Sequence, residues 1–185
     1  MNRRRERGAA LAEVSILLPF LILLGLGLTE IGFLVADHLA VASAAREGAR
    51  IGAAAGNFDI GTQTADDIIL RSVEQAACSM PFGSLTKVSV YAADTSGGVA
   101  NPSTQLNEYV PGGGGLNCAP TGPTGMVCSN GCPWDPGTRS VTIGSLADLG
   151  VRVDFQHISV TGAIPLPTIN WFETAVMRIQ PAITS

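Results

Sequence analysis

The apolar run from Val14 to Ala36 constrains the fold of this chain more than any other feature. Only Ser15, Thr29 and Glu30 carry polar side chains within it, and about 20 apolar residues suffice for a helix to cross a bilayer. The apolar residues together favour insertion by roughly 5 kcal/mol or more, which exceeds the few kcal/mol that one ionised Glu30 costs. The run is therefore expected to span a membrane as a helix.

The charges on either side of this run predict its orientation. Four arginines precede it, whereas the next Lys or Arg after it is Arg46. The four are Arg3, Arg4, Arg5 and Arg7. Because positively charged flanks stay on the cytoplasmic side, the N-terminus is expected in the cytoplasm and everything after Asp37 outside it.

A cleavable secretory signal is the main alternative interpretation of the N-terminal region. Such signals also have a basic start, an apolar run and a small-residue cleavage site, which residues 40–42 or 42–44 would supply here. Their apolar region usually measures about 7 to 15 residues. This run is longer and contains Glu30, which favours a retained anchor.

The junction between the arginines and the apolar run is the most specific motif of the chain. Gly8 is followed by four small or apolar residues, then by Glu13 and the apolar run. Here the chain resembles prepilins, and in particular the TadE-like pseudopilins of tight-adherence (Flp) pilus systems. The resemblance implies that a prepilin peptidase cuts between Gly8 and Ala9 on the cytoplasmic face, which leaves Glu13 as the fifth residue of the mature protein.

Other parts of the chain refine this resemblance. Val14 stands where the Flp major pilins usually have Tyr, and the chain is much longer than those subunits, so a minor pilin or pseudopilin is favoured over the main filament subunit. The likeness extends through Pro19 and through residues 45–50 and 175–181. It implies a role in initiating, capping or assembling a pilus or related secretion fibre. The implied partners are the peptidase, other pilins or pseudopilins and the inner-membrane assembly platform.

Two acidic residues of the helix each have two interpretations. Glu13 lies at the helix start, where its carboxylate can pair with a cation such as the new N-terminus of a neighbouring subunit, or can mark the hydrated end of an anchor. Glu30 either faces a partner or cavity inside the span, or lies in the headgroup zone beyond a span that ends near Leu28. Pro19 removes one helix hydrogen bond and is expected to bend or locally loosen the span.

The helix is expected to continue outward over residues 37–56, because apolar residues recur there at steps of three or four. Gly48, Gly52 and Gly56 form a stripe of small residues at every fourth position, which lets another helix or a sheet approach closely. A close-packed face inside the chain's own domain is the more ordinary interpretation, and a groove between subunits is the alternative.

The remaining pattern predicts an α+β fold. Apolar residues at helical spacing, with Asp66 and Asp67 in the first turn, predict a second helix over 64–77. Alternation with a period of two predicts strands over 87–92, 140–143, 150–161 and 173–179. Helices followed by strands, without regular alternation of the two, predict a small antiparallel sheet.

The expected organisation has three parts. They are a basic leader over 1–8, the transmembrane helix and its outward extension over 9–56, and an extracytoplasmic α+β head over 57–185. A Gly-, Pro- and Cys-rich loop at 94–137 separates the first two predicted strands. Loops of that length are usually functional or disordered.

The cysteines predict that the head is oxidised. There are four, an even number, and all follow the membrane span: Cys78, Cys118, Cys128 and Cys132. Outside the cytoplasm they are expected to form two disulfides in one of three connectivities, which would fold the loop and tie it to the helix end at Cys78. Zinc is the alternative, but Cys128 and Cys132 form a single weak pair, and His38 and His157 are distant from it in sequence. No metal is therefore expected.

The sequence contains no catalytic set that points to an enzyme. Residues 94–97 resemble an aspartic-protease loop, yet the motif occurs once and such enzymes need two carboxylates in one site. Phosphate-binding and dinucleotide-binding motifs are absent from the sequence, and a net charge of −4 provides no basic surface for nucleic acid. Neither a cofactor nor a nucleic acid is expected. The alternative function is a single-pass anchored extracytoplasmic binding module that does not join a fibre.

Overall fold

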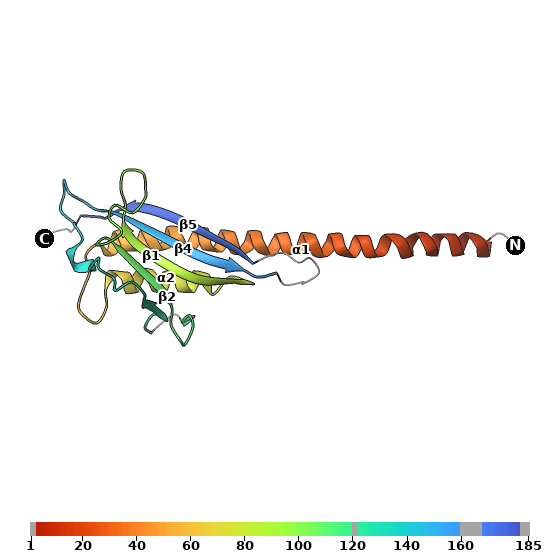
Figure 1. Cartoon of the computed structure of the whole chain (residues 1–185), viewed down its shortest axis with the longest axis horizontal. Helices are drawn as coiled ribbons and strands as arrows, with labels where there is room; N and C mark the ends of the chain where they lie inside the picture. Colours follow the sequence, from red (N-terminus) through yellow and green to blue (C-terminus); the bar gives the residue numbers. More distant parts are fainter. Residues whose placement is uncertain (1–2, 120–121, 160–167, 182–185) are drawn as a thin grey trace.

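Helix α1, Arg3–Ala55, dominates the computed structural model, which describes residues 3–119, 122–159 and 168–181. Its 53 residues rise by about 1.5 Å each, so it is about 80 Å long. The N-terminal half projects from a small head, and the C-terminal half lies within that head (Figure 1). The helix ends before Gly56, whose φ of 59° is a left-handed conformation that glycine adopts without strain. The predicted long helix is confirmed.

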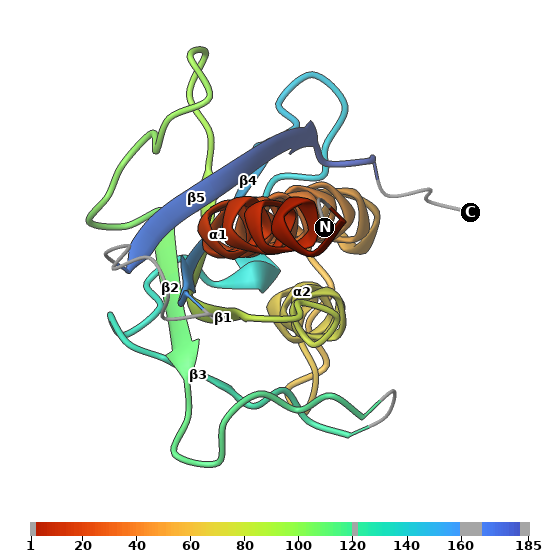
Figure 2. The ribbon, with the colours of Figure 1, turned by 90° about the vertical axis from the view of Figure 1, so that its right-hand side faces the viewer.

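Helix α2, Ala65–Ala77, confirms the second predicted helix. A capping box starts it: the Thr64 side chain accepts a hydrogen bond from the Asp67 backbone N–H, and the Asp67 carboxylate accepts one from the Thr64 backbone N–H. Ile69, Leu70 and Val73 form its buried face. The helix packs beside the C-terminal half of α1 (Figure 2).

Five strands form one antiparallel sheet in the order β3-β2-β1-β4-β5. The strands are β1 Gly83–Ala92, β2 Leu106–Pro111, β3 Met126–Cys128, β4 Asp148–His157 and β5 Ile169–Arg178, and a short 3-10 helix, η1, spans Pro136–Thr138. The predicted α+β class with an antiparallel sheet is confirmed. The first residues of β1 and β5 and the last residues of β4 lie at the end of the head from which α1 emerges (Figure 1). We call this end the base of the head.

The core lies between one face of the sheet and the two helices. Alternate residues of β4 point into it, including Val151, Val153 and Phe155, all exposed by 1% or less. They meet small residues of α1, such as Ala45 and Ala49, and the apolar face of α2. Because α1 supplies mainly alanine and glycine, it sits close to the sheet and becomes part of the core.

Two sequence predictions about strands were wrong. Residues 140–143 form a turn instead of a strand: the Ser145 N–H donates to Thr142, the Ala147 N–H donates to Ser140, and Gly144 has a φ of 99°. The alternation there is shorter than a stable strand, and the glycine reverses the chain. Strands β2 and β3 were missed because they lie in the segment 94–137, where glycine and proline obscure the pattern.

Other strand boundaries differ from the predictions by a few residues. Strand β4 starts two residues before the predicted start and ends at His157, although a strand was expected to continue to residue 161. Residues 160 and 161 lie outside the described residues. Strand β5 begins at Ile169, four residues before the predicted start. The extra residues of β5 lengthen the sheet toward the base of the head, whereas those of β4 lie at its opposite end.

Candidate processing and assembly site

The predicted cleavage site lies in the first turns of α1. Gly8 and Ala9 have helical backbone, and the side chains that the structure describes begin at Glu13, which is exposed. Glu13 is 17 residues before Glu30, so the two carboxylates are about 25 Å apart along the helix axis. The head therefore makes its contacts far from the predicted cleavage site.

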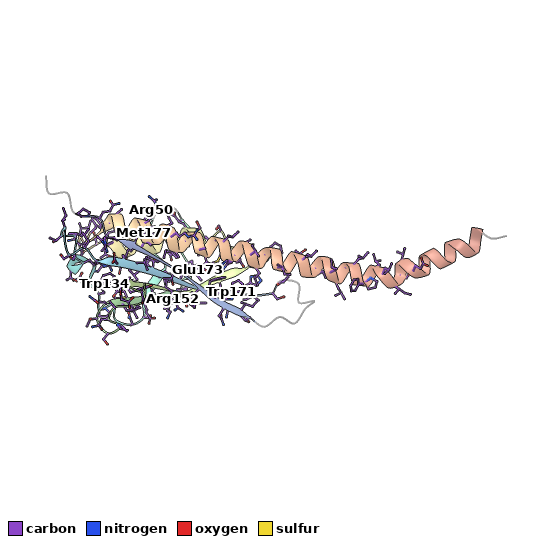
Figure 3. The ribbon with its side chains drawn as sticks, turned by 90° about the horizontal axis from the view of Figure 1, so that it is seen from above. Arg50, Trp134, Arg152, Trp171, Glu173 and Met177 are labelled. Carbon is purple, nitrogen blue, oxygen red and sulfur yellow. A yellow bond between two sulfur atoms is a disulfide. The ribbon has the colours of Figure 1, made fainter. Side chains whose placement is uncertain are left out.

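The projecting half of α1 carries an uncovered apolar surface. With the exception of Leu26, the large apolar side chains from Val14 to Leu28 are 50 to 77% exposed, and only 6% of the residues in its most apolar 18-residue stretch are buried. Among the described residues, this is the one helix long and apolar enough to cross a membrane. The helix continues through Pro19 without a break, and its projecting part curves gently (Figure 3). A surface of this size needs a lipid or a protein partner.

Glu30 is buried where α1 enters the head. It is 1% exposed, and its Oε1 lies 3.6 Å from Nε2 of His157, the last residue of β4. The other ring nitrogen of His157, Nδ1, lies 2.7 Å from Oδ2 of Asp37, which is also buried. Glu30 thus has a partner, and the partner comes from the chain's own head.

Sequence reasoning did not bring Asp37 and His157 into this site. Asp37 follows Glu30 by seven residues, which places both carboxylates on one face of the helix and is a signal that could have been used. His157 is 120 residues from Asp37, and nothing in the sequence pairs them. The two ring nitrogens face different carboxylates. Within the described parts of the chain, no group of three or more potential ligands is arranged to hold a metal ion.

The connection before β1 completes the contact between α1 and the base of the head. The Phe82 backbone N–H lies 3.5 Å from Asp37 Oδ1, and the Phe82 ring lies edge-on to Phe33 of α1 with centroids 4.5 Å apart. A Cβ at Gly83 would lie 3.0 Å from the Asp37 carboxyl carbon, so glycine permits the close approach. The base of the head is therefore fixed to α1 on two sides.

The glycine stripe of α1 faces the interior of the head. A Cβ at Gly48 would lie 2.9 Å from Val73 of α2, and one at Gly52 would overlap Leu149 of β4 and Ile69 of α2. A Cβ at Gly56 would lie 3.1 Å from Val141. The three glycines let α1 approach its own head closely, and this packing occupies the stripe within one chain.

The four cysteines form two disulfides. Cys78 at the end of α2 is bonded to Cys118, and Cys128 at the end of β3 is bonded to Cys132. The first bond ties the segment 94–137 to α2, as expected. The second closes a short turn that holds Asn130 against β2: the Asn130 amide donates to the Leu106 carbonyl at 2.8 Å and accepts from the Glu108 N–H at 3.0 Å. The turn thereby covers part of the β2 edge.

A second buried polar cluster joins α2 to β2. Asp66 pairs with Arg139 at 2.6 Å, and both side chains are 2% exposed or less. The Tyr109 hydroxyl and the Asn107 amide donate to the other Asp66 oxygen, at 2.7 and 2.8 Å. Burial raises the pKa of Tyr109, and the Asp66 charge raises it further, so the phenol remains a hydrogen-bond donor. This cluster is structural, and the sequence offered no signal for it.

The outer face of the sheet carries a hollow of about 710 Å³. Lys87, Tyr91 and Arg152 are among its lining residues. Lys87 pairs with Glu108 at 2.7 Å, and Arg152 pairs with Asp154 at 2.6 Å. These charges are therefore paired within the head.

Comparison with known protein families gives a match in the N-terminal part of the chain. The model of a family described as TadE-like protein matches residues 8–50. These residues include the predicted cleavage site, the exposed apolar half of α1 and most of the part of α1 that enters the head. No curated protein and no solved structure matches the chain. The match identifies residues 8–50 as a segment similar to the TadE-like protein family.

Proposed function

We propose that the protein is a membrane-anchored pseudopilin that acts in assembling, initiating or capping a tight-adherence pilus. The TadE-like match over residues 8–50 is the observation that carries this proposal. The exposed apolar half of α1 supports it, because that surface suits a bilayer first and the packed helices of a fibre later. In this proposal the helix waits in the membrane and is then extracted beside other pilin helices.

We infer an orientation with the N-terminus in the cytoplasm and the head outside. The four arginines before the span support a cytoplasmic N-terminus. The two disulfides support a head in an oxidising compartment. A prepilin peptidase would then meet the Gly8–Ala9 bond at the cytoplasmic face. Other pilins, pseudopilins and the assembly platform would meet the helix within the membrane.

The proposed action is mechanical and depends on binding, without catalysis. Glu13, at the start of the mature helix, would pair with a cationic group of a neighbouring subunit. The head would project from the membrane or from the fibre. The proposal includes incorporation at a pilus tip as well as a role confined to the membrane.

Processing after Gly8 tests the proposal directly. The intact mass and N-terminal sequence of the protein purified from its own membranes are compared for the wild type, Gly8→Arg and Glu6→Ala. We expect wild type and Glu6→Ala to begin at Ala9, because Glu6 is removed with the leader. We expect Gly8→Arg to retain the whole leader.

Other results would contradict the pilin function. A wild-type chain that begins near residue 43 or 45 would indicate a cleaved secretory signal and a soluble product. A wild-type chain that keeps its leader would indicate a plain anchor, and the alternative of an extracytoplasmic binding module outside any fibre would replace the proposal.

A further inference from the structure

Exposed apolar side chains gather at the base of the head. Phe82 precedes β1, Ile158 follows β4, and Trp171 and Phe172 lie near the start of β5. Phe82 and Trp171 are each 38% exposed, and Ile158 and Phe172 are each 54% exposed. Figure 3 shows Trp171 toward the end of the head from which α1 emerges. We call these four residues the basal rim.

The length of α1 sets the level of the basal rim relative to a bilayer. With Glu13 at the inner boundary, the hydrocarbon core of about 30 Å takes up about 20 helical residues, from Val14 to Phe33. The Phe33 ring lies 4.5 Å from the Phe82 ring. Phe82 therefore lies at the outer boundary of the hydrocarbon.

Trp171 lies slightly farther out, at the level of the lipid headgroups. Its ring is 5.3 Å from the ring of His38, which is five residues, or about 7.5 Å, beyond Phe33 along the helix. The headgroup layer adds roughly 5 to 7.5 Å on each side of the hydrocarbon, so Trp171 lies near its outer edge. Tryptophan is enriched at this level because its ring combines apolar surface with a hydrogen-bond donor.

Glu30 lies three residues below the outer boundary defined in this way. An ionisable side chain at that depth is costly if it faces lipid, yet Glu30 is 1% exposed and faces His157. The polar side chains of Glu30, Asp37 and His157 lie inside the base of the head, whereas the apolar residues of the basal rim are exposed on its outside. Burial inside the head keeps these ionisable side chains away from lipid.

We propose that the basal rim contacts the bilayer, so that the head is partly immersed in the outer membrane–water interface. Phe82 and Ile158 contact the upper parts of the lipid chains, and Trp171 and Phe172 lie at the headgroup level. The proposal rests on the membrane anchoring in the proposed function, and it is independent of processing and of fibre assembly. Phe82 contacts Phe33 at the outer end of the apolar run of α1, which is why lipid is proposed as the occupant of the rim.

Tryptophan fluorescence of the full chain can test this contact, because the chain has two tryptophans. Trp134 is 6% exposed and lies in the distal part of the head, away from Trp171 (Figure 3). The protein is reconstituted in phosphatidylcholine vesicles with or without lipids brominated near the glycerol end of their chains, which quench nearby tryptophans. We expect bromine to remove the Trp171 share of the wild-type emission and to leave Trp171→Phe unquenched.

Two further probes keep the test independent of Trp171. In the Trp171→Phe background, Phe82→Trp places a probe on the basal rim. Ile143→Trp places one before β4 at the opposite end of the head, on a side chain that is 81% exposed. We expect the Phe82 probe to be quenched and the Ile143 probe to keep its emission. Unchanged Trp134 emission in each variant verifies that the head has folded.

Flotation of the vesicles on a density gradient separates the possible results. Protein that floats with the vesicles while Trp171 and the Phe82 probe keep full emission would overturn the lipid contact and leave the anchor intact; the rim would then be a surface for another protein. Protein that does not float would overturn both anchor and lipid contact. Cleavage after Gly8 is measured separately by mass, so the test of processing does not depend on the result for the lipid contact.

Discussion

Gly52 lies where α1 comes closest to its neighbours, and a Cβ there would overlap Leu149 and Ile69. We predict that Gly52→Ala lowers the free energy of unfolding by about 1–3 kcal/mol, because overpacking forces the surrounding side chains to shift. Urea unfolding of the detergent-solubilised protein, followed by tryptophan fluorescence, measures the change.

Gly32 provides the matched control in the same helix. A Cβ at Gly32 would meet nothing within 4 Å, and alanine is a better helix former than glycine by up to about 1 kcal/mol. Gly32→Ala is therefore expected to be neutral or stabilising. Equal destabilisation by both substitutions would contradict the close packing of α1 in the head.

Arg139 allows a comparison between a buried and an exposed ion pair. Replacing Arg139 by Leu leaves Asp66 buried without its cation, which typically costs about 3–5 kcal/mol. Arg178→Leu breaks the pair with Asp148 on the surface, where the Arg178 side chain is 67% exposed. Its effect is expected to be small, because water and salt already screen that pair. Similar unfolding midpoints in urea for the two variants would refute this contrast.

At the level of single residues, the sequence identified the unusual side chains but not their partners. Glu30 stood out because it interrupts an apolar run, and the cysteines stood out by number and location. The contact between Glu30 and His157 joins α1 to the end of a strand that follows 127 positions later, and no local pattern encodes such a pair. The same holds for Asp66 and Arg139.

The two disulfides close loops of different length, so we predict that they contribute differently to the free energy of unfolding. Cys78 and Cys118 are separated by 40 residues, whereas Cys128 and Cys132 are separated by four. The loop-entropy model gives about 4 kcal/mol for the longer loop and about 2 kcal/mol for the shorter one. Replacing each pair by serines and measuring urea unfolding tests the difference. A larger loss of unfolding free energy in the variant that lacks Cys128 and Cys132 would contradict this prediction.

Secondary-structure elements could be predicted where local signals were strong. Helix α2 had acidic residues in its first turn and a regular apolar face, and it was predicted to within one residue. Strand β3 is only three residues long and exists because it pairs with β2, so its own sequence could not reveal it. Residues 140–143 show the converse, since a short alternation was overruled by the turn at Gly144.

For the whole molecule, we predict that the leader arginines determine which side of the membrane receives the head. Replacing Arg3, Arg4, Arg5 and Arg7 by Asn should leave part of the heads in the cytoplasm, because the charge bias is lost. Those heads would keep reduced cysteines, and trapping thiols with an alkylating reagent would show them by mass.

Arg46 and Arg50 supply the control for this orientation experiment. Both are exposed on the part of α1 that lies in the head, so replacing them by Asn leaves the leader unchanged. We expect fully oxidised cysteines in that variant. Full oxidation in the leader variant as well would show that the four arginines do not set the orientation.

The sequence revealed the two parts of the molecule but not how they are joined. Composition alone separated a membrane-length helix from an α+β head. Residues of the long helix after Glu30 also belong to the core of the head. This arrangement depends on small side chains of the helix that fit against the sheet. That fit is a tertiary property, which local sequence patterns do not reveal.

The continuity of α1 has a mechanical consequence. A single helix of 53 residues forms both the projecting segment and part of the core of the head, and its described residues contain no interruption. A twist applied to the projecting segment turns the sheet through the same angle, and an axial pull of one helical turn raises the head by about 5.4 Å. The contacts that fix the rotation of the projecting helix about its axis therefore also fix the direction in which the head faces.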